Sequence, residues 1–382
     1  MKEFNFYLPV KILFGEGIRN KVAQEAKVYG IKKPLIITDS FLKETEWGKL
    51  ITEQFYGAVV FDKVIPNPTI ASVNECADYF KKNNCDGIVA FGGGSTLDTA
   101  KACATLAYNN ESIAVFFDGN GENKQIASQY APIIAIPSTS GTGSEVSQYA
   151  VITDEKTKIK DSITSVGIYP KVALIDPEIT WNLPKALTVS TGLDVLSHAI
   201  ESITSTIDNP LTDILAAEAI RIVLEWLPKC LQIGNKEARA QMAYASMLAG
   251  IAMSHCCGTL PHGMGCPLSG HCGVPHGLAV GVLQSRVLKM IEKQCDNHLK
   301  RLINYLDRKY ESTNQISATD ALIYKINHLF EELGYDQNLK EFNITDEQIK
   351  RMAEDALIHG CTSLTPVKIS KDEIIKLYQE IQ

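Results

Sequence analysis

The side chains best suited to bind a metal ion gather in one part of this 382-residue chain. Asp194 and His198 stand four residues apart in a stretch with helical character, so their side chains share one face. His262 and His276 follow, fourteen residues apart, with Pro and Gly between them. A carboxylate and three imidazoles make a suitable set of ligands for Fe²⁺ or Zn²⁺ and leave positions open for a substrate oxygen. The sequence therefore predicts a metal site that would polarise an alcohol or carbonyl oxygen as a Lewis acid.

Each of these side chains also has a structural interpretation. A single histidine is more often packed or hydrogen-bonded than bound to a metal, and one Asp/His pair on a helix face is not a metal site by itself. The prediction rests on the occurrence of all four residues downstream of two phosphate-binding signals. A nicotinamide bound there would exchange the hydride, which no protein side chain can do.

The first phosphate-binding signal is Gly92-Gly93-Gly94-Ser95, which follows an apolar run and opens a helical stretch. Glycines let the backbone approach a ligand, and the free N–H groups at a helix start favour a phosphate. The alternative is a flexible turn. The second signal, residues 137–145, is rich in Ser, Thr and Gly, whose hydroxyls suit phosphate, ribose or substrate oxygens. It can equally be a capped helix start, and both interpretations can hold together.

Asp39 ends an apolar run at Leu35–Thr38. An acid at a strand end in a dinucleotide fold accepts hydrogen bonds from the adenosine ribose and repels an added 2′-phosphate. The residue therefore favours NAD(H), with NADP(H) less favoured. The alternative is an Asp in a surface turn.

The first half of the chain alternates short apolar runs with helical stretches, which is typical of a parallel sheet covered on both faces. The predicted strands are 35–38, 58–65, 87–91, 133–136 and 172–175, and the predicted helices between them include 70–83 and 96–108. Residues 4–14 are a further candidate, an edge strand that could pair across a dimer.

From about Pro184 onward, apolar residues recur every three to four positions, and strand signals become scarce. The helical stretches are 212–227, 238–254, 280–291, 318–333 and 346–358. We therefore expect an α/β dinucleotide-binding domain with an open, mainly parallel sheet at 1–183, and an all-helical metal-binding domain at 184–382.

Composition narrows the function classes. The net charge of −7 and the lack of a basic run argue against nucleic-acid and acidic-membrane partners. The sequence shows no signal-peptide pattern and no apolar run of about 18 residues, so we expect a cytoplasmic protein. Its 10 cysteines include no CxxC pair and fit reduced thiols, although Cys256, Cys257, Cys266 and Cys272 lie among histidines.

Together these residues resemble a known family, the iron-containing, or group III, alcohol dehydrogenases. The likeness runs over almost the whole chain. Its motifs are Gly15–Gly17, Pro66–Thr69, Gly92–Asp98, Ile136–Thr139, Gly141–Glu145, Asp176-Pro177, Thr191–Asp194, Ser197–Glu201 and Pro275–Gly277.

The resemblance implies the architecture shared with dehydroquinate synthase, with the site in the cleft between an N-terminal α/β domain and a C-terminal helical domain. By position, Asp194, His198, His262 and His276 match the metal ligands, and relatives are often homodimers or larger homo-oligomers. The implied cofactor contacts are Asp39, Asn67, Gly93, Gly94, Ser95, Asp98, Ser138 and Thr139, with Ser147, Lys160 and Leu183 as further matches.

One departure from the family concerns the proton relay. Many members have a second histidine four residues after the third ligand, where this chain has Cys266. Cys266 and His271 are therefore the candidate catalytic residues, unless both are packing variants and the relay runs through water and ribose hydroxyls. His255 and His271 add imidazole near the expected pocket, which favours a polar or anionic aldehyde as substrate.

Three functions remain open from the sequence. The first is NAD(H)-dependent reduction of an aldehyde, or oxidation of an alcohol, with Fe²⁺. The second is a zinc enzyme related to glycerol dehydrogenase or dehydroquinate synthase. The third is a non-catalytic nucleotide-binding regulator. The Asp194/His198 pair and the Pro275-His276-Gly277 motif favour the first.

Overall fold

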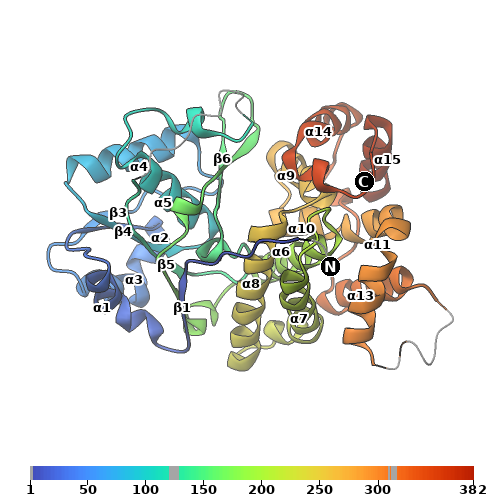
Figure 1. Ribbon diagram of the computed structural model, residues 1–382, viewed down its shortest axis with the longest axis horizontal. Coiled ribbons are helices and arrows are strands. Elements are labelled where there is room, and N and C mark those ends of the chain that lie inside the picture. The colour runs from blue at the N-terminus through green and yellow to red at the C-terminus, as the bar shows by residue number, and fades with distance from the viewer. Residues whose placement is uncertain (1–2, 120–128, 309, 311–315) are drawn as a thin grey trace. The chain divides into compact units, whose positions relative to one another are not determined.

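A computed structural model describes residues 3–119, 129–308, 310 and 316–382 (Figure 1). These residues group into two compact units. The first contains residues 7–182. The second contains residues 183–382 together with the segment up to Phe6. The prediction of folding domains at 1–183 and 184–382 remains a prediction, and each unit is described here by itself.

The first unit is built on a six-stranded sheet in which every neighbouring pair is parallel. The strands in sheet order are β1 (Lys11–Phe14), β8 (Val172–Ile175), β5 (Ile133–Pro137), β4 (Gly87–Gly92), β2 (Pro34–Ile37) and β3 (Val59–Phe61). Four of them, β2, β4, β5 and β8, are buried along their whole length. Their near-continuous apolar sequence is what a sheet covered on both faces requires.

Alternate side chains of these strands enter two separate cores, one on each face of the sheet. Leu35, Ile88 and Ile133 lie in the core that α4 (Ile70–Lys82) and α5 (Gly94–Leu106) cover. Their neighbours Ile36, Val89 and Ile134 lie in the core covered by α1 (Val22–Val28) and α3 (Glu46–Glu53). The short α2 (Ser40–Glu44) follows β2 directly. The remaining elements of this unit are the 3₁₀ helices η1 (Ile18–Lys21), η2 (Ile113–Phe116), η3 (Ser144–Val146), η4 (Val166–Ile168) and η5 (Pro177–Thr180).

The second unit is helical. Its longer helices are α6 (Lys185–Thr204), α7 (Pro210–Trp226), α8 (Lys236–Cys256), α9 (Leu260–Cys272), α11 (Gln284–Leu306), α13 (Ala318–Leu333), α14 (Asp346–Ile358) and α15 (Lys371–Ile381). The shorter elements are α10 (His276–Gly281), η6 (Pro228–Leu231), η7 (Lys340–Phe342) and η8 (Gly360–Leu364). Helix α6 is buried over nearly its whole length and packs against α7, α8 and α10. It is therefore the central support of this unit.

The observed elements confirm the predicted fold class, a parallel-sheet unit followed by a helical unit. Two local predictions need correction, and one element was not predicted. The predicted helix at 280–291 is interrupted between Gly281 and Gln284, where α10 ends and α11 begins. The predicted edge strand at 4–14 is reduced to β1. The antiparallel hairpin of β6 (Tyr149–Thr153) and β7 (Lys160–Thr164) was not predicted.

The chain's first residues take part in the helical unit. Asn209 Nδ2 donates a hydrogen bond to the carbonyl oxygen of Asn5 at 3.2 Å. The ring of Phe6 stacks on His255, with centroids 4.2 Å apart.

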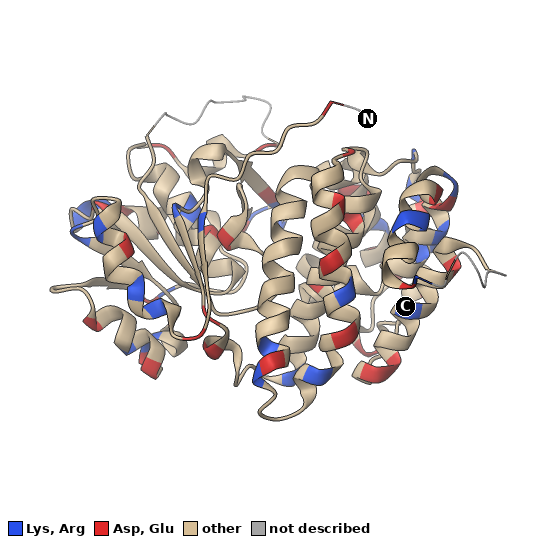
Figure 2. Cartoon of the chain, turned by 60° about the horizontal axis from the view of Figure 1, so that its bottom comes forward, with Lys and Arg blue, Asp and Glu red and all other residues tan. Residues whose placement is uncertain are grey.

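Lys and Arg are interspersed with Asp and Glu along the helices in Figure 2. Among the described residues, no helix combines the length and the apolar character needed to cross a membrane.

Candidate metal centre and cofactor loops

Helix α6 presents the first two predicted ligands on one buried face. Asp194 and His198 are only 3% and 5% exposed. The i, i+4 spacing brings His198 Nε2 to 3.7 Å from Asp194 Oδ1. The predicted pair therefore forms on the helix that is most deeply packed in this unit.

Two further helix starts bring imidazoles to the same oxygen. His262 lies in the first turn of α9, and its Nε2 is 3.6 Å from Asp194 Oδ1. His276 is the first residue of α10, and its Nε2 is 3.7 Å from that oxygen. The close approach of α10 to α6 depends on Gly277, because a Cβ there would lie 1.7 Å from the carbonyl oxygen of Ser190. The three predicted histidine ligands thus surround one carboxylate oxygen of the fourth, Asp194.

The polar atoms at this centre fit a divalent ion. Asp194 Oδ1 and His262 Nε2 are buried without a hydrogen-bond partner among the described residues, a costly arrangement unless another group binds them. The separations of 3.6–3.7 Å exceed hydrogen-bond lengths. Ligand atoms about 2.1 Å from one tetrahedral ion would lie about 3.4 Å apart. Asp194, His262 and His276 each offer one ligand atom within 4.8 Å of the others.

The charges at the centre favour an ionised carboxylate. Burial alone would raise the pKa of Asp194, but the imidazoles of His198, His262 and His276 lower it below its ordinary value. Burial would likewise lower the pKa of His262, yet the carboxylates of Glu201 and Asp194 raise it well above the usual value. An ionised, buried Asp194 carboxylate suits a cation.

Glu201 supports the centre from behind, a role that the sequence analysis missed. Its Oε1 is 2.7 Å from His262 Nδ1 and accepts a hydrogen bond from Gln284 at 2.9 Å. Its Oε2 accepts from the Thr259 N–H at 2.6 Å. With Nδ1 bound to Glu201, His262 directs Nε2 toward Asp194, as metal-binding histidines held by a carboxylate do. A signal was available, because residues 194, 198 and 201 share one face of a helix.

In the sheet unit, the two predicted phosphate loops meet at the carboxyl ends of neighbouring strands. Gly93 precedes the first residue of α5, and the Ser138 N–H donates to the Gly92 carbonyl at 2.9 Å. A Cβ at Gly93 would lie 3.3 Å from Thr139 Cγ2, so the two loops are in contact. Ser95 Oγ accepts from the Asn67 N–H at 3.2 Å. This edge of a parallel sheet is where α/β folds bind ligands.

A buried network lies beneath these loops. The Lys101 ammonium is fully buried and donates to Ser144 Oγ, Ser147 Oγ and the Tyr149 carbonyl at 2.8, 3.0 and 2.6 Å. Ser144 Oγ in turn donates to Asp98 Oδ1 at 2.7 Å. Burial lowers the pKa of Lys101 to about 8, which leaves the side chain charged at neutral pH. Lys101 was not predicted; an Asp and a Lys three residues apart after the glycine loop was the available signal.

The outer cofactor candidates have defined places. Asp39 Oδ1 caps α2 by accepting from the N–H groups of Phe41 and Leu42 at 2.9 and 2.8 Å. Asp39 follows β2 at the same sheet edge as the glycine loop. Lys160 Nζ donates to Asn67 Oδ1 at 2.8 Å. Leu183 belongs to the helical unit, where its carbonyl accepts from Arg239 at 3.1 Å.

The two candidate catalytic residues differ in position. Cys266 lies one turn after His262 on α9 and is hydrogen-bonded to His359. Burial would lower the pKa of His359, but the contact with Cys266 raises it. His271 lies nine residues after His262, about 13 Å along the helix axis at 1.5 Å per residue. Its Nε2 is 2.7 Å from Asp355 Oδ2. The structure therefore keeps Cys266 near the centre and does not bring His271 to it.

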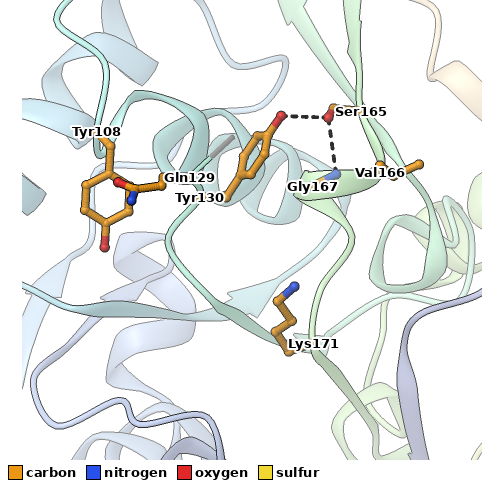
Figure 3. Close-up of a pocket in the computed structure, with 7 residues that line it drawn as sticks. All are labelled: Tyr108, Gln129, Tyr130, Ser165, Val166, Gly167 and Lys171. Carbon is orange, nitrogen blue, oxygen red and sulfur yellow. Dashed lines mark hydrogen bonds between the residues drawn. The ribbon is translucent and has the colours of Figure 1, made fainter. Parts of the chain in front are cut away.

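A pocket of about 750 Å³ lies elsewhere in the sheet unit, and Figure 3 shows the residues that line it. Tyr130 and Lys171 line it and stand just before β5 and β8, at the amino ends of those strands. Tyr130 Oη and Ser165 Oγ are 2.8 Å apart within it. It contains none of the predicted site residues and lies at the sheet edge opposite to the glycine loop.

The chain is similar to known proteins over nearly its whole length. A family model described as iron-containing alcohol dehydrogenase matches residues 9–177, and a model described as the C-terminal part of the Fe-containing alcohol dehydrogenase family matches residues 188–382. The chain is 34% identical to alcohol dehydrogenase 4 of Schizosaccharomyces pombe, over 98% of this chain and 88% of that protein. It is 32% identical to the NAD-dependent methanol dehydrogenase of Bacillus methanolicus, over 98% of each chain.

Solved structures show the same likeness. The sulfoacetaldehyde reductase of Bifidobacterium kashiwanohense, in complex with NAD⁺, matches with a TM-score of 0.88 at 32% identity, over 100% of this chain and 99% of that one. A 1,3-propanediol oxidoreductase matches with a TM-score of 0.93 at 29% identity over the full length of both chains.

Proposed function

The chain belongs to the iron-containing alcohol dehydrogenase family, as its motifs predicted, and on this premise we propose that it transfers a hydride between NAD(H) and a small alcohol or aldehyde at a bound divalent metal. Fe²⁺ is the proposed ion, with Zn²⁺ as the alternative. The observation that carries the proposal is the convergence of three imidazole nitrogens on one buried carboxylate oxygen that has no hydrogen-bond partner among the described residues.

In this proposal Asp194, His198, His262 and His276 hold the ion, and Glu201 fixes the orientation of His262 through Nδ1. The bound ion would supply Lewis acidity toward the substrate oxygen. Asp194 contributes a negative charge that balances the cation. The unpartnered His262 Nε2 provides a lone pair without a rearrangement of the ring.

The glycine loop and the start of α5 are proposed to bind the cofactor phosphates through backbone N–H groups. Gly93, Gly94, Ser95, Ser138 and Thr139 are the proposed contacts. Asn67, Asp98, Ser147 and Lys160 are further proposed contacts in the sheet unit, and Leu183 is one in the helical unit. Asp39 is proposed to select NAD(H) over NADP(H), because its carboxylate would repel a 2′-phosphate. Asp39 also caps α2, which is compatible with this role because the two capping hydrogen bonds use Oδ1.

Small primary alcohols and their aldehydes are the proposed substrates, in line with the names of the methanol dehydrogenase and the 1,3-propanediol oxidoreductase. The argument for an anionic aldehyde from extra imidazoles is weaker than the sequence indicated. His271 contacts Asp355, and His255 stacks on Phe6 while its Nδ1 lies 2.8 Å from the Ile251 carbonyl. An anionic aldehyde remains a second candidate through the likeness to sulfoacetaldehyde reductase.

We further propose a cytoplasmic homodimer or larger homo-oligomer. Strand β1 supports an oligomer, because it forms one edge of the sheet and, within the described part of the chain, pairs only with β8. Light scattering after gel filtration tests this part directly, and a monomer at micromolar concentration would contradict it.

The test of the function is an anaerobic assay of NADH oxidation with a panel of small neutral and anionic aldehydes, after loading with Fe²⁺ or Zn²⁺. We expect turnover that requires the ion and that NADPH supports poorly. The Asp39→Asn variant keeps a residue that can cap α2 but removes the charge, so its preference for NADH over NADPH should fall. NADH binding without turnover on the whole panel would instead support a nucleotide-binding regulator.

A further inference from the structure

Two thiols face each other in the helical unit, next to the proposed metal centre. Cys257 follows the last residue of α8, and Cys361 lies in η8. Their Sγ atoms are 3.9 Å apart. Neither is a predicted metal ligand, and both are free cysteines at partly exposed positions.

Exposure separates this pair from another thiol contact in the chain. Cys76 and Cys103 are also in contact, but both are 0% exposed in the core of the sheet unit. Of the two pairs, only Cys257 and Cys361 belong to residues that are partly exposed to solvent, so a dissolved oxidant has better access to them than to the other two. The hydrogen bond from Cys361 lowers the pKa of Cys257 to about 7, and the thiolate is the reactive form of a cysteine.

The backbone between Cys257 and the metal centre is short and held by Glu201. Thr259 donates to Glu201 Oε2 from its N–H at 2.6 Å and from its hydroxyl at 3.2 Å. Glu201 Oε1 in turn contacts His262 Nδ1. Cys257 itself has a φ of +60°, an unusual conformation for a residue with a side chain. Thr259 therefore connects the short segment after Cys257 to the carboxylate that orients His262.

The other thiol is fixed to the same loop from the C-terminal side. The Cys361 N–H donates to His359 Nδ1 at 3.2 Å, and Thr365 Oγ1 accepts from the Leu260 N–H at 2.9 Å. A disulfide needs the two sulfurs at about 2.05 Å, so they must approach by nearly 2 Å. Side-chain rotation can supply part of this approach. Because Thr365 after η8 is bonded to Leu260, any backbone movement that closes the bond would reach the segment between Cys257 and His262.

We propose that Cys257 and Cys361 form a reversible disulfide that weakens metal binding at the centre. With a small-molecule disulfide as oxidant, the Cys257 thiolate attacks one sulfur and releases one small thiolate. The Cys361 thiolate then attacks Cys257 Sγ and releases the second. The two protein thiols lose their protons and are oxidised, and the small disulfide is reduced to two thiols. A dithiol reverses the exchange.

The test uses the full chain, metal-free and Zn²⁺-loaded, exposed anaerobically to oxidised glutathione so that iron oxidation plays no part. Peptide mapping by mass spectrometry should find a Cys257–Cys361 cross-link, and dithiothreitol should remove it. Zn²⁺ titration of the cross-linked metal-free protein against a chromophoric chelator should show an affinity that is reduced 10- to 100-fold. This is the range found when a group that orients a metal ligand is lost.

Cys257→Ser and Cys361→Ser are the two informative variants, and Cys272→Ser, elsewhere on the partly exposed surface of this unit, is the matched control. We expect each of the first two to bind Zn²⁺ normally and to be insensitive to the oxidant, while the control behaves like the wild type. The absence of this cross-link, or a cross-link that leaves Zn²⁺ affinity unchanged, overturns the proposal. The expected loss of Zn²⁺ affinity rests on the proposed function, but the disulfide and the metal site can fail separately. If the reduced protein binds no Zn²⁺, the proposed metal site is wrong, whether or not the disulfide forms.

Discussion

Glu201 Oε1 lies 2.7 Å from His262 Nδ1, so a buried carboxylate behind the centre fixes which nitrogen of the imidazole faces Asp194. Glu201→Gln removes the charge at nearly constant volume. We expect a 10- to 100-fold loss of Zn²⁺ or Co²⁺ affinity, because the histidine becomes a weaker and less oriented ligand. Glu218→Gln, which alters a partly exposed pair with Arg221, is the control for removing one charge from the helical unit. Equal affinities in both variants would contradict the role of Glu201.

Gly277 allows α10 to lie against α6, and the structure gives this contact a direct test. In Gly277→Ala the new Cβ would stand 1.7 Å from the Ser190 carbonyl oxygen and 3.0 Å from Asp194 Cβ. The helices must separate, so we expect a loss of about 2–3 kcal/mol in the free energy of unfolding and weaker metal binding through His276. Gly360→Ala meets no atom within 4 Å and should change neither quantity in denaturation and metal titration.

Lys101 should be needed both for stability and for binding NADH. In Lys101→Met the side chain keeps its length but leaves Ser144, Ser147 and the Tyr149 carbonyl without their buried donor. Breaking such a network costs about 3 kcal/mol, and the loop that carries Ser147 loses its anchor. We expect a lower urea midpoint and a raised dissociation constant for NADH, measured by fluorescence. The exposed Lys82→Met is the comparison, and unchanged NADH binding in Lys101→Met would exclude this anchoring role.

Glu145 gives the sheet unit a dependence on pH. Burial raises the pKa of this carboxyl to about 7, above its value in an unfolded chain. The folded state then holds a proton that the unfolded state releases near pH 4.5, so stability falls as the pH rises from about 4.5 through 7. Glu145→Gln should match the wild type near pH 5 and be more stable by about 2–3 kcal/mol at pH 8 in urea titrations. A constant difference between the two proteins across this range would contradict the raised pKa.

His271 should be dispensable for turnover. Its ring is paired with Asp355 about 13 Å along α9 from His262, too far for direct proton transfer at the centre. We expect His271→Ala to keep the wild-type turnover number and pH profile, whereas a shifted profile would return His271 to the mechanism.

The fold could be predicted where one physical pattern dominates. Strands buried on both sides, such as β4 and β5, read as uninterrupted apolar runs, and the loops that follow them are marked by glycines and hydroxyls. The β6–β7 hairpin was missed because its strands have five residues each and β7 is mostly polar, so that Ile163 is its one residue in the core, opposite Ala150 and Ile152 of β6. The break between α10 and α11, just before Gln284, was missed because apolar residues keep their helical spacing across it.

The candidate site could likewise be predicted only in part. The four ligand positions were named from residue types and a family likeness, and the structure gathers their side chains at one oxygen. Glu201 and Lys101 were missed because a buried charge reveals its partner only in three dimensions: Glu201 meets a histidine 61 residues later, and Lys101 meets Ser144 43 residues later. His271 was named as a substitute proton relay because Cys266 stands where many family members have a histidine, and helix geometry separates His271 from the centre.

The most direct test of the account is anomalous diffraction from crystals of the anaerobically purified protein, measured on both sides of the iron and zinc absorption edges. We expect one ion per chain at about 2.0–2.3 Å from Asp194 and from the Nε2 atoms of His198, His262 and His276, with the edge identifying the metal. If these side chains are ordered and no ion lies between them, or if the ion instead binds at Asp208, Asp213 and His298, the proposed centre is wrong.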